Sequence, residues 1–129
     1  MENKTPQLQL AQTFNLLKYT FVIVPIVAGA DKFTNLLTNW EQYLNPSIAG
    51  MLPFSAATFM MIVGVIEIIA GLIVLKRTDI GGYIVAAWLT AIALTLLLGF
   101  RYVDVAVRDL VMAIAAFSTA RISKIVYKL

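Results

Sequence analysis

A single carboxylate, Glu67, interrupts an apolar stretch of the chain that runs from Ala56 to Leu75. At about 1.5 Å of rise per residue, a helix of this length crosses a hydrocarbon layer of about 30 Å. Glu67 then lies inside the membrane, where a carboxylate is costly unless it is paired, protonated or facing a cavity. On such a helix Gly64, Glu67 and Gly71 share one face, and small residues let a second helix approach closely. We therefore expect Glu67 to face the interior of a helix bundle and to bind a proton.

Further ionisable residues lie near the ends of the other apolar segments. Asp31 and Lys32 end the first segment, and Arg101, Asp104, Arg108 and Asp109 begin the last one. We therefore expect one charge cluster on the outer side of the membrane. Asp104 and Arg108 are four residues apart and can pair on one helix. Lys32 is left to pair with Asp109 or to reach inward to Glu67. A depth difference of about 10 Å argues against that second contact unless a helix tilt, a kink at Pro25 or a bridging water shortens the distance. We predict that Lys32 and Arg108 contact an anion or a head group, oriented by Asp104 and Asp109.

The composition indicates a membrane protein that lacks the catalytic, redox and metal-binding chemistry of cysteine and histidine. Of the 129 residues 60% are hydrophobic and 13% are charged, whereas soluble domains average about 25% charged residues. The chain has no cysteine and no histidine. This excludes thiol redox chemistry, haem or zinc ligation by those side chains, and a Ser-His or Cys-His catalytic pair on this chain. We predict no catalytic residue and no metal site, and therefore no enzyme on its own.

The apolar segments predict an all-α fold, a four-transmembrane-helix bundle that forms a single membrane domain. Polar residues 1–12 show no folding signal, and Pro53 suits the first turn of the second helix. Small residues at four-residue spacing predict a close-packing stripe on the third helix, at Ala87, Ala91, Thr95 and Gly99. Ala113, Ala116 and Ala120, spaced by three and four residues, predict a second stripe on the fourth helix. The predicted helices cover about residues 13–32, 53–75, 80–99 and 103–123.

Residues 33–52 are too polar to span a membrane and too apolar to form a free loop. Trp40 and Tyr43 stand there among leucine, asparagine and threonine residues. Such a segment tends to lie at the membrane interface, so we predict an extracytoplasmic amphipathic segment with Trp40 and Tyr43 as interfacial anchors. A substrate lid made from residues 33–55 is the sharper alternative.

The basic residues predict the orientation. Four spans put both termini on one side, and basic residues concentrate on the cytoplasmic side of membrane proteins. Seven basic residues belong to the termini and the second loop, against three near the other face, so both termini should be cytoplasmic. The net charge of +3 needs only anionic lipid as its partner, with no nucleic acid. The seven are Lys4, Lys18, Lys76, Arg77, Arg121, Lys124 and Lys128, and the three are Lys32, Arg101 and Arg108.

Three motifs in order carry a family resemblance. The segment from Gly29 to Phe33, Gly-Ala-Asp-Lys-Phe, resembles the Gly-x-x-Lys-Phe signature of the DoxX family of small four-helix membrane proteins. Residues 64–71 are similar to that family's second-helix motif, with its Glu followed by a Gly, and residues 104–110 resemble the opening of its fourth helix. The resemblance covers the chain from about Leu16 to Arg121. It implies a multi-pass protein of the bacterial cytoplasmic (inner) membrane, in a family associated with respiratory and sulfur-oxidising complexes, including the DoxD-type subunit of a thiosulfate:quinone oxidoreductase.

Three functions stay open at this point. The first is a non-catalytic or quinone- or anion-binding subunit of a membrane redox complex, in which the charged residues bind an anion or relay a proton. It carries no cofactor of its own beyond a possible quinone, and it needs a protein partner. The second is a structural or assembly subunit whose charges pair across helices. The third is a small proton-coupled transporter that uses Glu67. A homo-oligomer is expected as readily as a larger complex.

Overall fold

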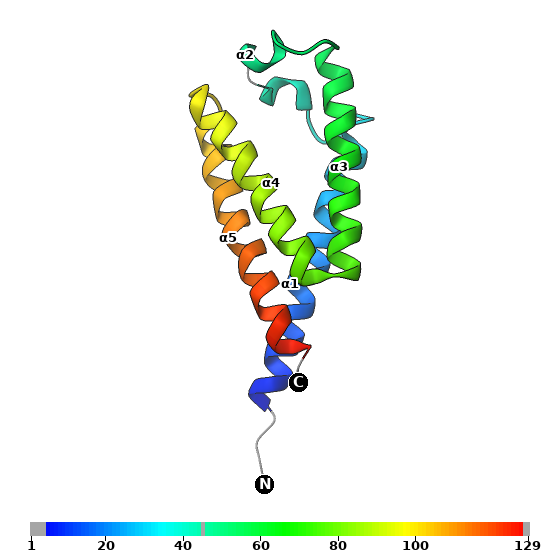
Figure 1. The fold of residues 1–129 in the computed structure, drawn as a ribbon, viewed down its shortest axis with the longest axis vertical. Helices are drawn as coiled ribbons and strands as arrows, with labels where there is room; N and C mark the ends of the chain where they lie inside the picture. Colours follow the sequence, from blue (N-terminus) through cyan, green and yellow to red (C-terminus); the bar gives the residue numbers. More distant parts are fainter. Residues whose placement is uncertain (1–4, 45, 128–129) are drawn as a thin grey trace.

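The computed structural model describes residues 5–44 and 46–127, and within them the chain is helical and contains no strand (Figure 1). The all-α prediction is confirmed. Lys4 and Lys128, two of the basic residues used above, lie outside the described residues. The helices are α1 (Thr5–Asp31), the short 3-10 helix η1 (Trp40–Tyr43), α2 (Pro46–Ala49), α3 (Ala56–Lys76), α4 (Thr78–Leu98) and α5 (Val103–Val126).

The first residues of α1 and α3 differ from the predicted ones. Helix α1 starts at Thr5 instead of near residue 13, so most of the polar stretch before it is helical. Helix α3 starts after Ser55, whose side chain accepts a hydrogen bond from the backbone N–H of Thr58, and Pro53 lies outside the helix. A serine cap satisfies one of the unpaired N–H groups of a first turn, which proline cannot do.

The long helices pack as two pairs. Helix α1 lies against α3, and α4 lies against α5 along its length (Figure 1). Gly29 and Gly64 meet backbone to backbone, because a Cβ built on Gly64 would lie 2.5 Å from the Gly29 carbonyl oxygen. In the other pair, Gly82 lies against the backbone and side chain of Ala120. Small residues therefore set the closest approach in both pairs, as is usual between membrane helices.

One of the two predicted small-residue stripes is right. Ala113, Ala116 and Ala120 are buried on α5. On α4, however, Ala87 and Ala91 are exposed, and the buried face runs through Gly82, Ala86 and Ala93 instead. The spacing of four was correct, but several faces of α4 carry small residues and the pattern alone could not select the packed one.

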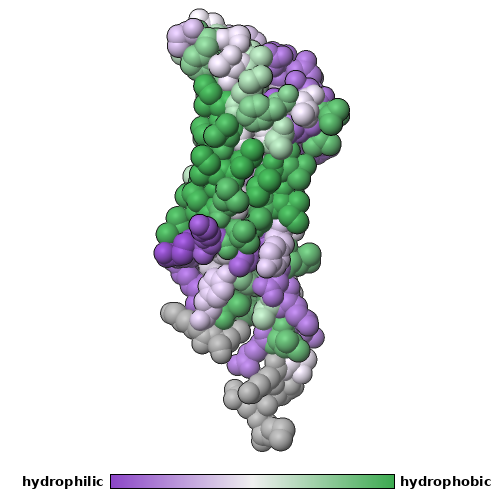
Figure 2. Space-filling view, turned by 90° about the vertical axis from the view of Figure 1, so that its right-hand side faces the viewer, coloured by the Kyte–Doolittle hydropathy of each residue, from purple (hydrophilic) through white to green (hydrophobic). Residues whose placement is uncertain are grey.

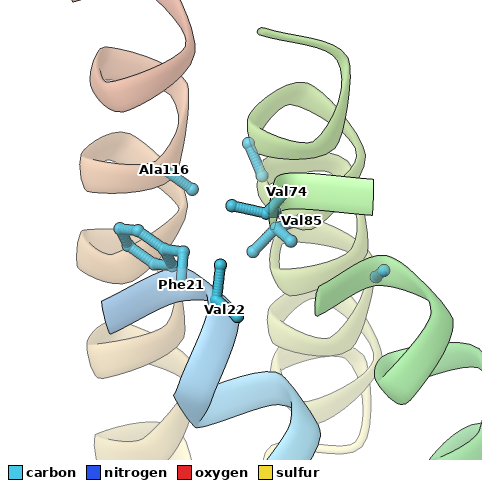
Figure 3. Packing of buried hydrophobic residues seen from close by; sticks show 7 residues of the cluster. Phe21, Val22, Val74, Val85 and Ala116 are labelled. Atoms are coloured by element: carbon cyan, nitrogen blue, oxygen red, sulfur yellow. The ribbon is translucent and has the colours of Figure 1, made fainter. Parts of the chain in front are cut away.

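The two pairs meet in an apolar core near the α3–α4 turn. Figure 3 shows Phe21 and Val22 of α1 pointing towards Val74, Val85 and Ala116 of the other three long helices. Only one residue separates α3 from α4, so their adjoining ends have to lie together. At the opposite ends of α3 and α4 no short turn joins the two helices. There the two helix pairs separate towards the segment that contains η1 and α2 (Figure 1). We call this the distal end.

Three of the described helices, α1, α3 and α4, are long and apolar enough to cross a membrane. Figure 2 shows apolar side chains across the middle of one face, with polar ones towards both ends. Isoleucine, valine and leucine side chains of α3 are exposed on the outside of the bundle, which is the expected position for lipid contact. Helix α5 has a similar length but a more polar composition, since it carries Asp104, Arg108, Asp109, Arg121 and Lys124.

Candidate functional site

A buried ion pair joins the two helices of the first pair. The Lys32 ammonium lies 2.7 Å from a carboxylate oxygen of Glu67, and the two side chains are only 5% and 10% exposed. The prediction that Glu67 faces the bundle interior is confirmed by its burial beside Gly64 and Gly71. Lys32 and Glu67 are in direct contact, so the expectation that their depths keep them apart is wrong.

The glycine contact explains why the two side chains meet. Lys32 follows the end of α1, and its Cβ lies 3.2 Å from the position that a Cβ on Gly64 would take. Lys32 is therefore level with Gly64, and Glu67 lies one turn further along α3, about 5 Å along the axis. A lysine side chain spans that distance. The estimate of about 10 Å counted residues along each helix and missed the register that Gly29 and Gly64 impose.

Asp31, next to the ion pair, organises the chain that follows α1. Its two carboxylate oxygens accept hydrogen bonds from the Thr34 hydroxyl, from the backbone N–H groups of Leu36 and Leu37, and from the indole N–H of Trp40, at 2.8 to 3.0 Å. A buried carboxylate with four donors is well satisfied. Asp31 thus folds residues 34–40 back over the end of the helix and is not available to the predicted charge cluster.

The aromatic residues of η1 pack near the Lys32–Glu67 ion pair. The Lys32 ammonium lies 3.9 Å from the centroid of the Trp40 ring, a cation–π contact. Tyr43 packs edge-to-face on Tyr102 at 4.7 Å, and the Tyr102 hydroxyl donates to Gln42 at 3.3 Å. Trp40 and Tyr43 therefore contact the rest of the protein through their rings. The lid alternative stays a hypothesis. Their role as interfacial anchors stays a prediction.

Between the two helix pairs lies a cavity of about 550 Å³, within the range of about 300–1,000 Å³ that small-molecule sites occupy. Its floor is the apolar core at Phe21 and Val85, and residues 38–44 cover its distal end. The walls come from α1, α3, α4 and α5, and their side chains are mostly apolar. The cavity thus fills the space where the two pairs diverge.

The cavity also has polar groups. Lys32 and Glu67 lie in its α1 and α3 wall, and Arg108, Asp109 and Trp88 lie in the opposite wall. Asp109 interacts electrostatically with both members of the ion pair. The indole nitrogen of Trp88 is buried and has no hydrogen-bond partner among the described residues.

The predicted outer charge cluster does not form as one group. Asp104 and Arg108 approach to 3.9 Å as predicted, but their side chains are 68% and 76% exposed. Arg101 lies over the ring of Tyr102 at 5.6 Å. Lys32 pairs with Glu67, and Asp109 makes no ion pair within the described part of the chain. The structure therefore brings Lys32, Glu67, Arg108 and Asp109 to one cavity and leaves Asp104 outside it.

Two site residues were not predicted from the sequence. Asp31 was treated as one more outer charge, although four donors within nine residues surround it. Trp88 lies near the middle of the predicted third helix, away from the membrane interface where tryptophan is common, and this position is the only signal in the sequence for a buried indole N–H. A buried indole N–H without a partner is unusual, because buried tryptophan normally donates a hydrogen bond.

The arrangement can bind an amphipathic molecule, since it combines mostly apolar walls with a few polar groups. Among the described residues no group of three His, Cys, Asp or Glu side chains could hold a metal ion. In comparisons with known proteins, no family model, no curated protein and no solved structure matches this chain.

Proposed function

We propose that this chain is a DoxX-like integral membrane subunit that binds a quinone or a similar lipophilic ligand in the cavity between its helix pairs. The observation that carries the proposal is the cavity of about 550 Å³, whose walls are mostly apolar and include a few charged and hydrogen-bonding side chains. A quinone has an apolar tail and a compact polar ring, so it matches that distribution. The four long helices form a four-transmembrane-helix bundle in this proposal, with α5 as the fourth span and the distal segment on the extracytoplasmic side.

The role is that of a non-catalytic subunit in a membrane redox complex of the respiratory or sulfur-oxidising kind. Without cysteine or histidine, the chain cannot supply the common ligands of haem or iron–sulfur clusters, so a partner protein has to carry the electrons. Arg108, which lines the cavity, is the contact for an anionic substrate group in this scheme. The motif resemblance to the DoxX family supports the same assignment.

The test is a comparison of two tryptophan substitutions one turn apart on α4. Ala87 and Ala91 are both exposed residues of α4, but only Ala91 lines the cavity. Wild type, Ala91→Trp and Ala87→Trp are purified in a mild detergent, and bound quinone and co-purifying proteins are quantified by mass spectrometry. We expect quinone with wild type and Ala87→Trp, and at least a tenfold loss with Ala91→Trp. Equal quinone in the two variants, or none above bulk lipid in wild type, would contradict the proposal.

One observation favours the structural subunit as the second candidate. Lys32 and Glu67 satisfy each other, and such a pair fixes the register of α1 against α3 without needing a ligand. If this is its task, Ala91→Trp leaves complex assembly intact while Glu67→Gln weakens it. A proton-coupled transporter predicts instead that Glu67→Gln abolishes substrate-driven proton flux in vesicles.

A further inference from the structure

Two polar groups in the cavity wall make no hydrogen bond or ion pair with other described residues. Trp88 of α4 has its indole N–H buried without a partner, and Asp109 of α5 has no hydrogen bond or ion pair among the described residues. Both line the cavity. Lys32 and Glu67 across the cavity are already paired at 2.7 Å. A ligand therefore finds its unsatisfied partners on the α4–α5 wall.

The packing of α4 on α5 places Trp88 and Asp109 at similar positions along the helix axis. Tyr83 lies against Phe117, with ring centroids 5.3 Å apart, and Gly82 lies against Ala116 and Ala120. In this antiparallel register residue 88 is level with about residue 112. Asp109 lies three residues before residue 112 on α5, a separation of about 4.5 Å along the helix axis. One compact ring can reach both groups.

Trp88 and Asp109 differ in the hydrogen bonds that they can make, and this difference determines which ligand can satisfy both. An indole N–H can only donate a hydrogen bond, and an ionised carboxylate can only accept one. A molecule that satisfies both needs a donor and an acceptor in its polar head. The two carbonyl oxygens of a quinone only accept, and an ammonium group only donates. A hydroxyl group does both.

We propose, on the basis of the proposed function, that Asp109 and Trp88 form the head-group site of a quinol, and that the cavity binds the reduced quinol more tightly than the oxidised quinone. One quinol hydroxyl donates to the Asp109 carboxylate, and a quinol oxygen accepts from the Trp88 N–H. A quinone leaves the carboxylate without a donor. Hydrogen bonds to charged groups are stronger than neutral ones, so the preference should be about tenfold.

The experiment measures the ratio of quinol to quinone bound at equilibrium. Detergent-purified protein is incubated without oxygen with decylubiquinol or decylubiquinone, and the retained ligand is quantified by mass spectrometry. Wild type should favour the quinol about tenfold. Asp109→Asn should bring the ratio close to one, because an amide can also donate to a quinone carbonyl. Asp104→Asn is the matched control, because Asp104 is an exposed carboxylate on the same helix and should leave the ratio unchanged.

A second measurement uses the wild-type protein alone, so it does not depend on a variant that folds. The dimethyl ether of decylubiquinol keeps the ring and tail but has no hydrogen-bond donor, and we expect it to bind about tenfold more weakly than the quinol. Trp88→Phe should weaken the binding of quinol and quinone alike, several-fold.

The outcomes separate this inference from the function on which it rests. If wild type binds neither form better than Ala91→Trp does, the proposed function fails. If wild type binds both forms in the cavity but the ratio is near one, or Asp109→Asn leaves a tenfold ratio unchanged, the quinol site is overturned while quinone binding stands.

Discussion

At the residue scale, the ion pair and the unpaired polar groups play different parts. Lys32 and Glu67 are desolvated, and each compensates the charge of the other. Burying such a pair does not by itself favour folding, but removing one partner leaves an uncompensated charge. Among the described residues Asp109 has no ion-pair partner and the Trp88 indole N–H has no hydrogen-bond partner. The first two residues are therefore suited to hold α1 on α3, and the other two are suited to bind a ligand.

Substitutions in the ion pair test this division. Lys32→Met leaves Glu67 buried without a cation and should lower the free energy of unfolding by about 3–5 kcal/mol. The double variant Lys32→Met with Glu67→Met should recover most of that loss, because both charges are gone. Thermal unfolding in detergent, followed by circular dichroism, measures the effect.

The exposed pair Asp104–Arg108 provides the control for this measurement. Arg108→Met removes an ion pair at 3.9 Å with both side chains mostly exposed, so it should cost about 0.5 kcal/mol or less. A loss in Lys32→Met no larger than that of Arg108→Met would show that the buried pair does not hold the helices together.

At the element scale, glycine contacts determine how closely the helices pack and hence which side chains meet. The backbones of α1 and α3 touch at Gly29 and Gly64, and this contact sets the height at which Lys32 faces Glu67. The one-residue turn between α3 and α4 holds the other end of the bundle together. The cavity is the space that remains where these two constraints no longer act.

The glycine contact predicts a strong effect of a single methyl group. Gly64→Ala puts a Cβ 2.5 Å from the Gly29 carbonyl oxygen, so α1 and α3 have to separate. We expect a loss of about 1–3 kcal/mol in the free energy of unfolding, as for other overpacked sites, together with a weaker Lys32–Glu67 contact.

Gly99→Ala is the matched control for Gly64→Ala. Gly99 is exposed at the end of α4 and has a φ of −82°, which alanine adopts without strain. We expect its thermal unfolding to match that of wild type. If Gly64→Ala unfolds at the same temperature as Gly99→Ala, the close approach of the two backbones does not determine stability.

At the scale of the whole molecule, the described chain has its two ends at one side and the segment with η1 and α2 at the other (Figure 1). A belt of apolar side chains lies between them (Figure 2). Described basic residues at the end near the termini include Lys76, Arg77 and Lys124. This distribution supports an orientation with both termini in the cytoplasm, which follows from the preference of basic residues for that side.

Single-cysteine labelling tests the orientation, because the natural chain has no cysteine to interfere. Lys76→Cys, next to the α3–α4 turn, should be protected from a membrane-impermeant maleimide in intact cells and react after the membrane is opened. Arg101→Cys, between α4 and α5, should react in intact cells. The reverse pattern would invert the topology, and labelling of both sites from the same side would mean that α4 does not cross the membrane.

The sequence by itself determined the helical class, the apolar segments and the inward face of Glu67, because these depend on local composition and on the 3.6-residue period of a helix. It also predicted the Asp104–Arg108 contact, since both residues lie on one helix. Only the tertiary structure decided that Lys32 reaches Glu67, that Asp31 binds the following loop, and that Trp88 and Asp109 share a cavity wall. Each of these depends on the register and divergence of helices that are distant in the chain. That geometry is set by a few backbone contacts at glycine and by a one-residue turn, so it could not be read from the spacing of charges alone.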